Sequence, residues 1–162
     1  MRGKIAIVVM LSLAVVAAGY AWYQNYQRSV RARAFWGDKA ATIRFAKKVE
    51  AFRLEENDEP GDVTDISSAP GLLNARTSLM SDDAFDWSVA PFTPSSSSEW
   101  TFGVRFVSDE NNVTLLFSDQ SDAMFVRELG EAVQLDPKTA SGWRSYLQKA
   151  LSKTTDQARR RD

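Results

Sequence analysis

The chain has 162 residues, of which 44% are hydrophobic and 25% are charged, a balance typical of folded globular proteins. It contains no histidine and no cysteine, which excludes Ser-His-Asp and Cys-His catalysis, disulfides, iron–sulfur clusters and zinc sites built from these residues. Any enzyme would have to use carboxylates, hydroxyls, Lys, Arg or Tyr. We therefore expect a protein without catalytic activity and without a cofactor.

The net charge of −1 conceals a segregation of charge along the chain. Residues 1–54 carry a net charge of +8, residues 55–136 carry −14 and residues 137–162 carry +5. The acidic middle argues against nucleic acid as a partner. The basic ends suit an anionic lipid surface or an acidic protein, and they are equally compatible with solvated surface charge.

An uncharged, mostly apolar run of 19 residues extends from Ile5 to Tyr23. As a helix it would be about 28 Å long, close to the ~30 Å hydrocarbon core of a bilayer. Cationic and aromatic residues suited to the membrane interface lie at or just beyond its two ends, namely Arg2, Lys4, Tyr20, Trp22, Tyr23, Tyr26 and Arg28. The run predicts a transmembrane anchor over residues 1–27, with the lipid bilayer as a partner.

Cleavage of this segment is an open alternative. Small residues at 16–18, Val-Ala-Ala, would suit a signal peptidase, and the chain would then be a secreted soluble domain. The length of the run, its aromatic flank and the arginines at positions 28, 31 and 33 favour a retained signal anchor, because positive charges directly after an export signal oppose translocation.

Two features of the sequence make opposite predictions about the side of the membrane on which the domain lies. The positive-inside rule slightly favours a cytoplasmic domain, because more Lys and Arg follow the apolar run than precede it. The N-terminal tail of four residues favours the opposite orientation, because so short a tail usually stays inside. We expect an extracytoplasmic domain.

The segment after the anchor is predicted to begin with a basic stalk over residues 28–39, helical up to Gly37. Residues 40–48 fit either a short helix or an extension of the next strand. "VEAFRL", residues 49–54, predicts the first strand, and an acidic loop follows it.

A helix is predicted over residues 67–80. Ser68 would be its N-cap and Pro70 would lie in its first turn, and apolar residues follow at helical spacing. A loop rich in proline and serine, residues 86–99, follows this helix and is longer than most connections.

Three consecutive strands with short polar turns come next, which predicts an antiparallel meander. They are "WTFGVRFV" at residues 100–107, "VTLLF" at 113–117 and "AMFV" at 123–126. Strict alternation in the first of them predicts one shared face for Trp100, Phe102, Val104 and Phe106.

The last predicted element is an amphipathic helix. Asp136 is suited to be its N-cap and Pro137 its first residue. Its apolar stripe consists of Ala140, Trp143, Leu147, Ala150 and Leu151. We expect this stripe on the aromatic face of the sheet, with Trp143 against Trp100 or Phe102.

The order of elements predicts the fold class α+β: an N-terminal transmembrane helix, then a small, mainly antiparallel sheet with helices packed on one face. The folded domain is expected over residues 40–153, followed by a basic tail over residues 154–162.

Three motifs carry a family resemblance: "VEAFRL", "FGVRF" and "VTLLFSD". With them the chain resembles a family of small, functionally uncharacterised bacterial proteins that have an N-terminal lipobox, signal or anchor. The resemblance covers roughly residues 45–150 and implies a membrane-anchored or exported α+β domain. Many members carry a pair of cysteines in the hydrophobic strand. This chain has Leu116, Phe117, Ser118 and Asp119 there, so no thiol role carries over.

Candidate site residues come from the charged positions. Arg105 lies on the strand face opposite the aromatic residues, and we expect it to pair with Glu50; these two are the candidate ligand-binding residues. Glu50, Asp119 and Asp122 are the candidates for an alternative function, a carboxylate-dependent hydrolase, although turn chemistry explains both aspartates. The acidic loop lacks the spacing of a calcium-binding loop, and we expect no metal.

The function that these features predict is a single-pass, membrane-tethered interaction or scaffold domain. Its partners would be the bilayer and proteins, and the sequence does not identify its ligand.

Overall fold

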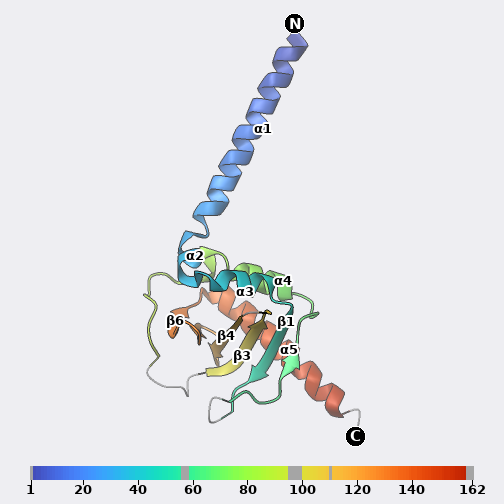
Figure 1. The fold of residues 1–162 in the computed structure, drawn as a ribbon, viewed down its shortest axis with the longest axis vertical. Helices are drawn as coiled ribbons and strands as arrows, with labels where there is room; N and C mark the ends of the chain where they lie inside the picture. The colour runs from blue at the N-terminus through green and yellow to red at the C-terminus, as the bar shows by residue number, and fades with distance from the viewer. Residues whose placement is uncertain (1, 56–58, 95–99, 110, 160–162) are drawn as a thin grey trace.

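The computed structural model describes the backbone of residues 2–55, 59–94, 100–109 and 111–159; the side chains of residues 2–6, 8, 25 and 153–159 lie outside the description. Within these residues a long N-terminal helix projects from an α+β domain (Figure 1). The described helices are α1 (Arg2–Gln27), α2 (Val30–Trp36), α3 (Lys39–Phe45), α4 (Leu72–Ser78), the short 3-10 turn η1 (Asp82–Ala84) and α5 (Pro137–Arg159).

The described strands form one antiparallel sheet in the order β2-β1-β3-β4-β5-β6. Their bounds are β1 (Lys48–Arg53), β2 (Thr64–Asp65), β3 (Trp100–Val107), β4 (Asn112–Ser118), β5 (Ala123–Val126) and β6 (Glu131–Gln134). The predicted α+β class, the first strand and the three-stranded meander are confirmed. The sequence missed β2 and β6, because two- and four-residue strands are too short to show alternation.

The core lies on one face of the sheet, between the strands and the helices. Inward residues of β1, β3, β4, β5 and β6 form a single buried cluster with side chains of α2, α3, α4 and α5. α5 contributes Ala140, Trp143, Leu147 and Leu151, so its predicted stripe is confirmed. The predicted cap is present as well, since the Asp136 carboxylate accepts a hydrogen bond from the Lys138 N–H at 2.9 Å.

Trp100 lies on the opposite face of the sheet, and its predicted position on the aromatic face is wrong. The pairing of β3 with β4 shifts between Trp100 and Phe102, and such a bulge turns the side chains before it to the other side. Trp100 therefore packs with Phe52 and Leu116 in a second, smaller cluster and stacks on Phe125 at 5.6 Å between ring centroids. Trp143 stacks on Phe117 instead, at 5.0 Å.

Gly103 is the residue that lets this second cluster form. It pairs with Phe52 across β1 and β3, and the Phe52 ring lies directly over it. A Cβ at residue 103 would meet Cε2 of that ring at only 2.1 Å. A strand glycine here thus marks close approach of an aromatic side chain.

The predicted stalk, residues 28–39, belongs in large part to the domain. α1 ends at Gln27, and α2 places Ala32 and Trp36 in the core with no exposed surface. The indole N–H of Trp36 donates to the Leu79 carbonyl at 2.6 Å. α2 ends at Trp36 with Gly37 as the predicted stop, and residues 39–45 form the helix α3, one of the two alternatives that the sequence left open.

The helix predicted over residues 67–80 is shorter than expected. It begins at Leu72, because Gly71 precedes it in a left-handed conformation with φ of +89°, which interrupts any helix that starts at Ser68. Ser68 and Pro70 instead form the turn before α4. At the other end of the chain, α5 continues through Arg159 into the predicted basic tail.

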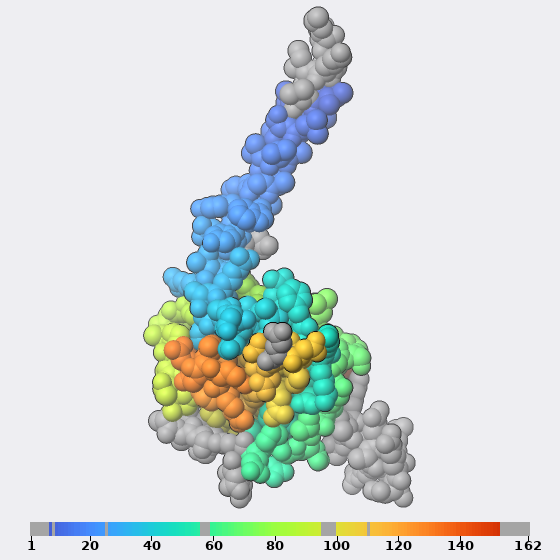
Figure 2. All heavy atoms as spheres, viewed as in Figure 1, coloured from blue at the N-terminus to red at the C-terminus, as the bar shows by residue number. Residues whose placement is uncertain are grey.

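α1 stands clear of the domain, and Figure 2 shows it as a separate column above the rest of the molecule. Its large apolar side chains from Ile7 to Val16 are exposed wherever they are described. In the described part of the chain, no helix combines the length and the apolarity needed to cross a membrane.

Candidate functional site

The predicted ion pair between Arg105 and Glu50 is present on the face of the sheet opposite the main core. The Arg105 Nη1 lies 3.5 Å from Glu50 Oε2, and the Lys48 Nζ lies 2.7 Å from Glu50 Oε1. The hydrogen bond and charge of Glu50 raise the pKa of Lys48. Arg105 also lies over the ring of Phe52, at 5.5 Å from its centroid. Glu50 thus has two cationic partners within the fold, and its predicted ligand-binding role remains a prediction.

The two aspartates of the β4–β5 turn serve the turn itself. Asp122 accepts a hydrogen bond from the Ser118 hydroxyl at 2.5 Å, and Asp119 accepts one from the side-chain amide of Gln120 at 2.9 Å. Both aspartates are exposed, and Glu50 is in register with Arg105 and, through it, with Thr114, which lies five residues before Asp119. The structure therefore does not bring the three hydrolase candidates together.

Other carboxylates act as helix caps or as acceptors in loops. The Asp82 carboxylate accepts from the backbone N–H groups of Arg31 at 3.2 Å and Ala32 at 2.7 Å, which caps α2 from a distant part of the chain. At Asp86, hydrogen bonds from the hydroxyl and backbone of Ser88 lower the carboxyl pKa. A lowered pKa is the opposite of what a general acid needs.

No group of three acidic side chains in position to hold a metal ion is found in the part of the chain that the structure describes. The acidic loop is only partly covered, because residues 56–58 lie outside the description.

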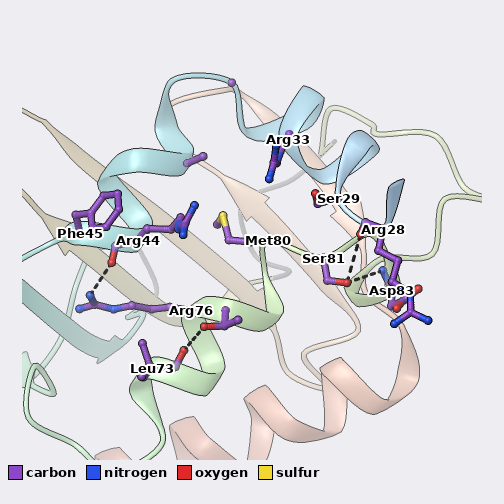
Figure 3. Close-up of a pocket in the computed structure, with 13 residues that line it drawn as sticks. Arg28, Ser29, Arg33, Arg44, Phe45, Leu73, Arg76, Met80, Ser81 and Asp83 are labelled. Atoms are coloured by element: carbon purple, nitrogen blue, oxygen red, sulfur yellow. Dashed lines mark hydrogen bonds between the residues drawn. The ribbon is translucent and has the colours of Figure 1, made fainter. Parts of the chain in front are cut away.

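An open pocket of about 670 Å³ lies between α2, α3 and α4, near the foot of α1. Four arginines line it and Asp83 is its only acidic lining residue among those described, so the lining carries a positive charge. We name it the arginine pocket after Arg28, Arg33, Arg44 and Arg76 (Figure 3).

Arg33 and Arg44 line the arginine pocket from two different helices. They extend from α2 and α3 toward the space beside Met80 (Figure 3). Arg28 lies toward one end near Asp83, and Arg76 reaches along the other end, where its Nη1 donates to the Arg44 carbonyl at 3.4 Å (Figure 3). None of the four forms an ion pair within the described residues.

Arg76 is the most buried of the four arginines. Its guanidinium lies over the Phe106 ring, 5.6 Å from the centroid, and its Nε is buried without a hydrogen-bond partner in the described structure. Desolvation lowers the pKa of Arg76, while the nearby Tyr146 acts in the opposite direction. An arginine remains charged under such a shift, so its incompletely paired guanidinium can bind an anion.

Apolar side chains border the arginine pocket. Phe45 at the end of α3 and Leu73 in α4 are 72% and 75% exposed, unusually high for large apolar residues on a folded domain. They lie beside Arg44 and Arg76, respectively, on the same two helices (Figure 3). Exposed apolar residues thus lie next to cations that form no ion pair among the described residues.

The predicted interface aromatics lie in the last part of α1, next to this pocket. Tyr20, Trp22, Tyr23 and Tyr26 are exposed, and Trp22 stacks on Tyr26. The Arg33 guanidinium lies over the Tyr26 ring, 5.4 Å from its centroid, which joins this aromatic group to the pocket. Of the predicted interface residues, Arg28 lines the pocket, whereas the side chains of Arg2 and Lys4 lie outside the description.

Arg44 and Arg76 are the two pocket arginines that the sequence did not place near the membrane. They are 32 positions apart, and only the packing of α3 beside α4 places them in one site. The available signal was weak: Arg76 is one of three cations in a segment with 17 acidic residues.

Comparison with known protein families, with curated proteins and with solved structures finds no match for this chain. The resemblance to small bacterial anchored proteins therefore stays a prediction.

Proposed function

We propose that this protein is a single-pass, membrane-tethered protein whose α+β domain acts by binding and not by catalysis. α1 would hold the domain at the surface of the bilayer, with its arginine pocket next to the lipid headgroups. The protein partners of such a domain would meet it at that surface.

The exposed apolar surface of α1 carries the proposal. Seven large apolar side chains between residues 7 and 16 are exposed: Ile7, Val9, Met10, Leu11, Leu13, Val15 and Val16. Because successive residues are 100° apart around a helix, these positions cover every side of α1. A helix that is apolar all round needs burial in a core or in a bilayer, and the domain does not cover this one.

The charge pattern at the end of α1 supports the same placement. The apolar run ends at Tyr23, and helix α1 continues to Gln27. At about 1.5 Å per residue, Arg28 follows Tyr23 by about 7 Å, which is near the ~5–8 Å thickness of one headgroup layer. Aromatic residues would then lie at the interface and the arginines just outside it.

The use of the carboxylates supports binding over hydrolysis. Asp82 and Asp136 cap helices, Asp119 and Asp122 stabilise a turn, and Glu50 is paired with two cations. A carboxylate-dependent hydrolase would need two such groups across a cleft, one of them desolvated.

The test is fractionation of the full-length chain after a carbonate wash. We expect the wild-type protein in the membrane pellet and Leu13→Arg in the supernatant, because an arginine at the centre of a membrane helix opposes insertion by about 3 kcal/mol, roughly a hundredfold. Val63→Arg is the matched control, since it adds the same charge at an exposed apolar residue of the domain. It should stay in the pellet.

A wild-type protein in the soluble fraction that begins near Gly19 would overturn the tether and identify a secreted domain. A reporter fused after Asp162 decides the side of the membrane, for which the extracytoplasmic placement remains our prediction.

A further inference from the structure

We propose that the arginine pocket binds the phosphate of an anionic phospholipid headgroup from the leaflet into which α1 is anchored. This inference rests on the proposed membrane tether and specifies what the domain contacts there. The lipid would lie with its phosphate between Arg33 and Arg44 and its acyl end toward the exposed rim of Phe45 and Leu73.

The chemistry of the site favours a phosphate. A guanidinium donates two parallel N–H groups to a phosphate, and a pair of arginines from two helices can hold one from both sides. Arg33 and Arg44 come from α2 and α3, line the same pocket and have no ion-pair partner within the described residues (Figure 3). Since no carboxylate of the described residues forms an ion pair with them, both can bind an external anion.

The position of the pocket favours a lipid over a free anion. Two of its arginines, Arg28 and Arg33, follow α1 within six residues, so the pocket lies where the predicted span ends. Figure 1 shows α2, α3 and α4 together at the end of the domain from which α1 rises, whereas α5 runs away from them toward the opposite end. The arginines of the pocket therefore lie on the side of the domain nearest the predicted bilayer.

The apolar rim gives a second reason to choose a lipid. Phe45 and Leu73 are among the most exposed large apolar residues of the domain, and both border the pocket. A soluble phosphate would gain nothing from them. A phospholipid presents a phosphate and an apolar chain at adjacent depths, which matches arginines bordered by a phenylalanine and a leucine.

The experiment uses the full chain reconstituted in nanodiscs that contain equal amounts of phosphatidylglycerol and phosphatidylcholine. Native mass spectrometry, after the protein is released from the nanodisc, counts the lipids that each chain retains. Flotation of the same protein with vesicles separately measures whether it is bound to the membrane. We expect the wild-type protein to retain about ten molecules of phosphatidylglycerol for each phosphatidylcholine. This ratio is the order of magnitude expected from a charge-assisted bidentate contact.

The double variant Arg33→Gln with Arg44→Gln should float like wild type and lose this preference. Arg53→Gln with Lys149→Gln is the control, because it removes the same charge from exposed positions of β1 and α5 outside the pocket. It should keep the preference. The wild-type comparison between the two lipids needs no substitution, so it remains valid if a variant folds poorly.

Equal retention of the two lipids by a wild-type protein that floats would overturn the headgroup site and leave the tether standing. Loss of the preference in both double variants would also overturn it, because the effect would then belong to net charge and not to the pocket. Failure of wild type to float would overturn the tether, whatever the lipid count.

Discussion

The two long helices of this protein, α1 and α5, differ in how they use their apolar residues. α5 confines them to one stripe, and Trp143 and Leu147 from that stripe lie in the core. α1 has apolar residues on every side, and its large described side chains remain exposed although both helices belong to one short chain. A stripe matches one face of a sheet, whereas an all-round apolar surface has no counterpart in a domain of this size.

The contrast between α1 and α5 should have its largest effect on the free energy of unfolding when one leucine in each helix is replaced by alanine. Leu147→Ala should lower the free energy of unfolding of the domain by about 2–5 kcal/mol, because Leu147 is fully buried and its loss leaves a cavity. Leu13→Ala on α1 should change it by less than about 0.5 kcal/mol. Chemical unfolding of the full chain in detergent, followed by tryptophan fluorescence, measures both. Equal losses would contradict the independence of α1 from the domain.

The junction between the two regions depends on Asp82. Its carboxylate caps α2 through Arg31 and Ala32, and its backbone N–H donates to the Arg28 carbonyl at 2.7 Å. Asp82→Ala should cost about 1 kcal/mol, the usual value of a lost cap, measured by the same unfolding assay. Asp83→Ala, an exposed neighbour without this role, is the control and should change stability by less than about 0.5 kcal/mol. A larger loss at Asp83 than at Asp82 would contradict the capping role.

The buried face of α5 also carries a polar group without a hydrogen-bond partner. The hydroxyl of Tyr146 is buried and unpaired within the described residues. Tyr146→Phe should therefore leave the free energy of unfolding unchanged or raise it by up to about 1 kcal/mol, since it removes a desolvated donor and keeps the ring. Urea unfolding at pH 7 measures this, and a clear loss of stability would indicate a partner for the hydroxyl.

The smallest expected effect is a change in the pH dependence of stability at alkaline pH. Burial raises the pKa of Tyr146, although the charge of Arg76 acts in the opposite direction. Because the folded pKa lies above the unfolded value of about 10, the contribution of neutral Tyr146 is complete below about pH 10 and is lost as the pH rises through the folded value.

Wild type should therefore lose more stability above pH 10 than Tyr146→Phe does, which unfolding midpoints at several pH values would detect. Tyr23→Phe, on the exposed part of α1, is the control and should leave the wild-type slope in place. Identical slopes for wild type and Tyr146→Phe would show that the phenol titrates equally in the folded and unfolded chain.

Much of the domain could be predicted because the decisive signals were local. Alternation over residues 100–107, and short apolar runs between polar turns at 113–117 and 123–126, predicted β3, β4 and β5, and Asp136 with Pro137 predicted the start of α5. The pairing of Glu50 with Arg105 was predicted as well, because both lie on one face of strands that became neighbours. Apart from that pairing, each of these signals spans a few residues, which is the range over which propensity and periodicity act.

The site was less predictable than the fold. Arg28 was expected at the membrane interface, but Arg44 and Arg76 were not expected beside it. Trp100 changed face because of a bulge that no alternation pattern shows. The segment 28–39 was expected as a stalk, and the burial of Trp36 against Leu79 places it in the domain instead.

By itself, the sequence determined which segments are apolar on one side, on alternate residues or all round, and so it determined α5, the meander and the isolation of α1. Tertiary structure alone decided that an aspartate at position 82 caps a helix that begins at position 30, and that arginines from three helices surround one pocket. The physical reason is range: periodicity reports the neighbours of a residue along the chain, whereas a pocket depends on which helices the core draws together.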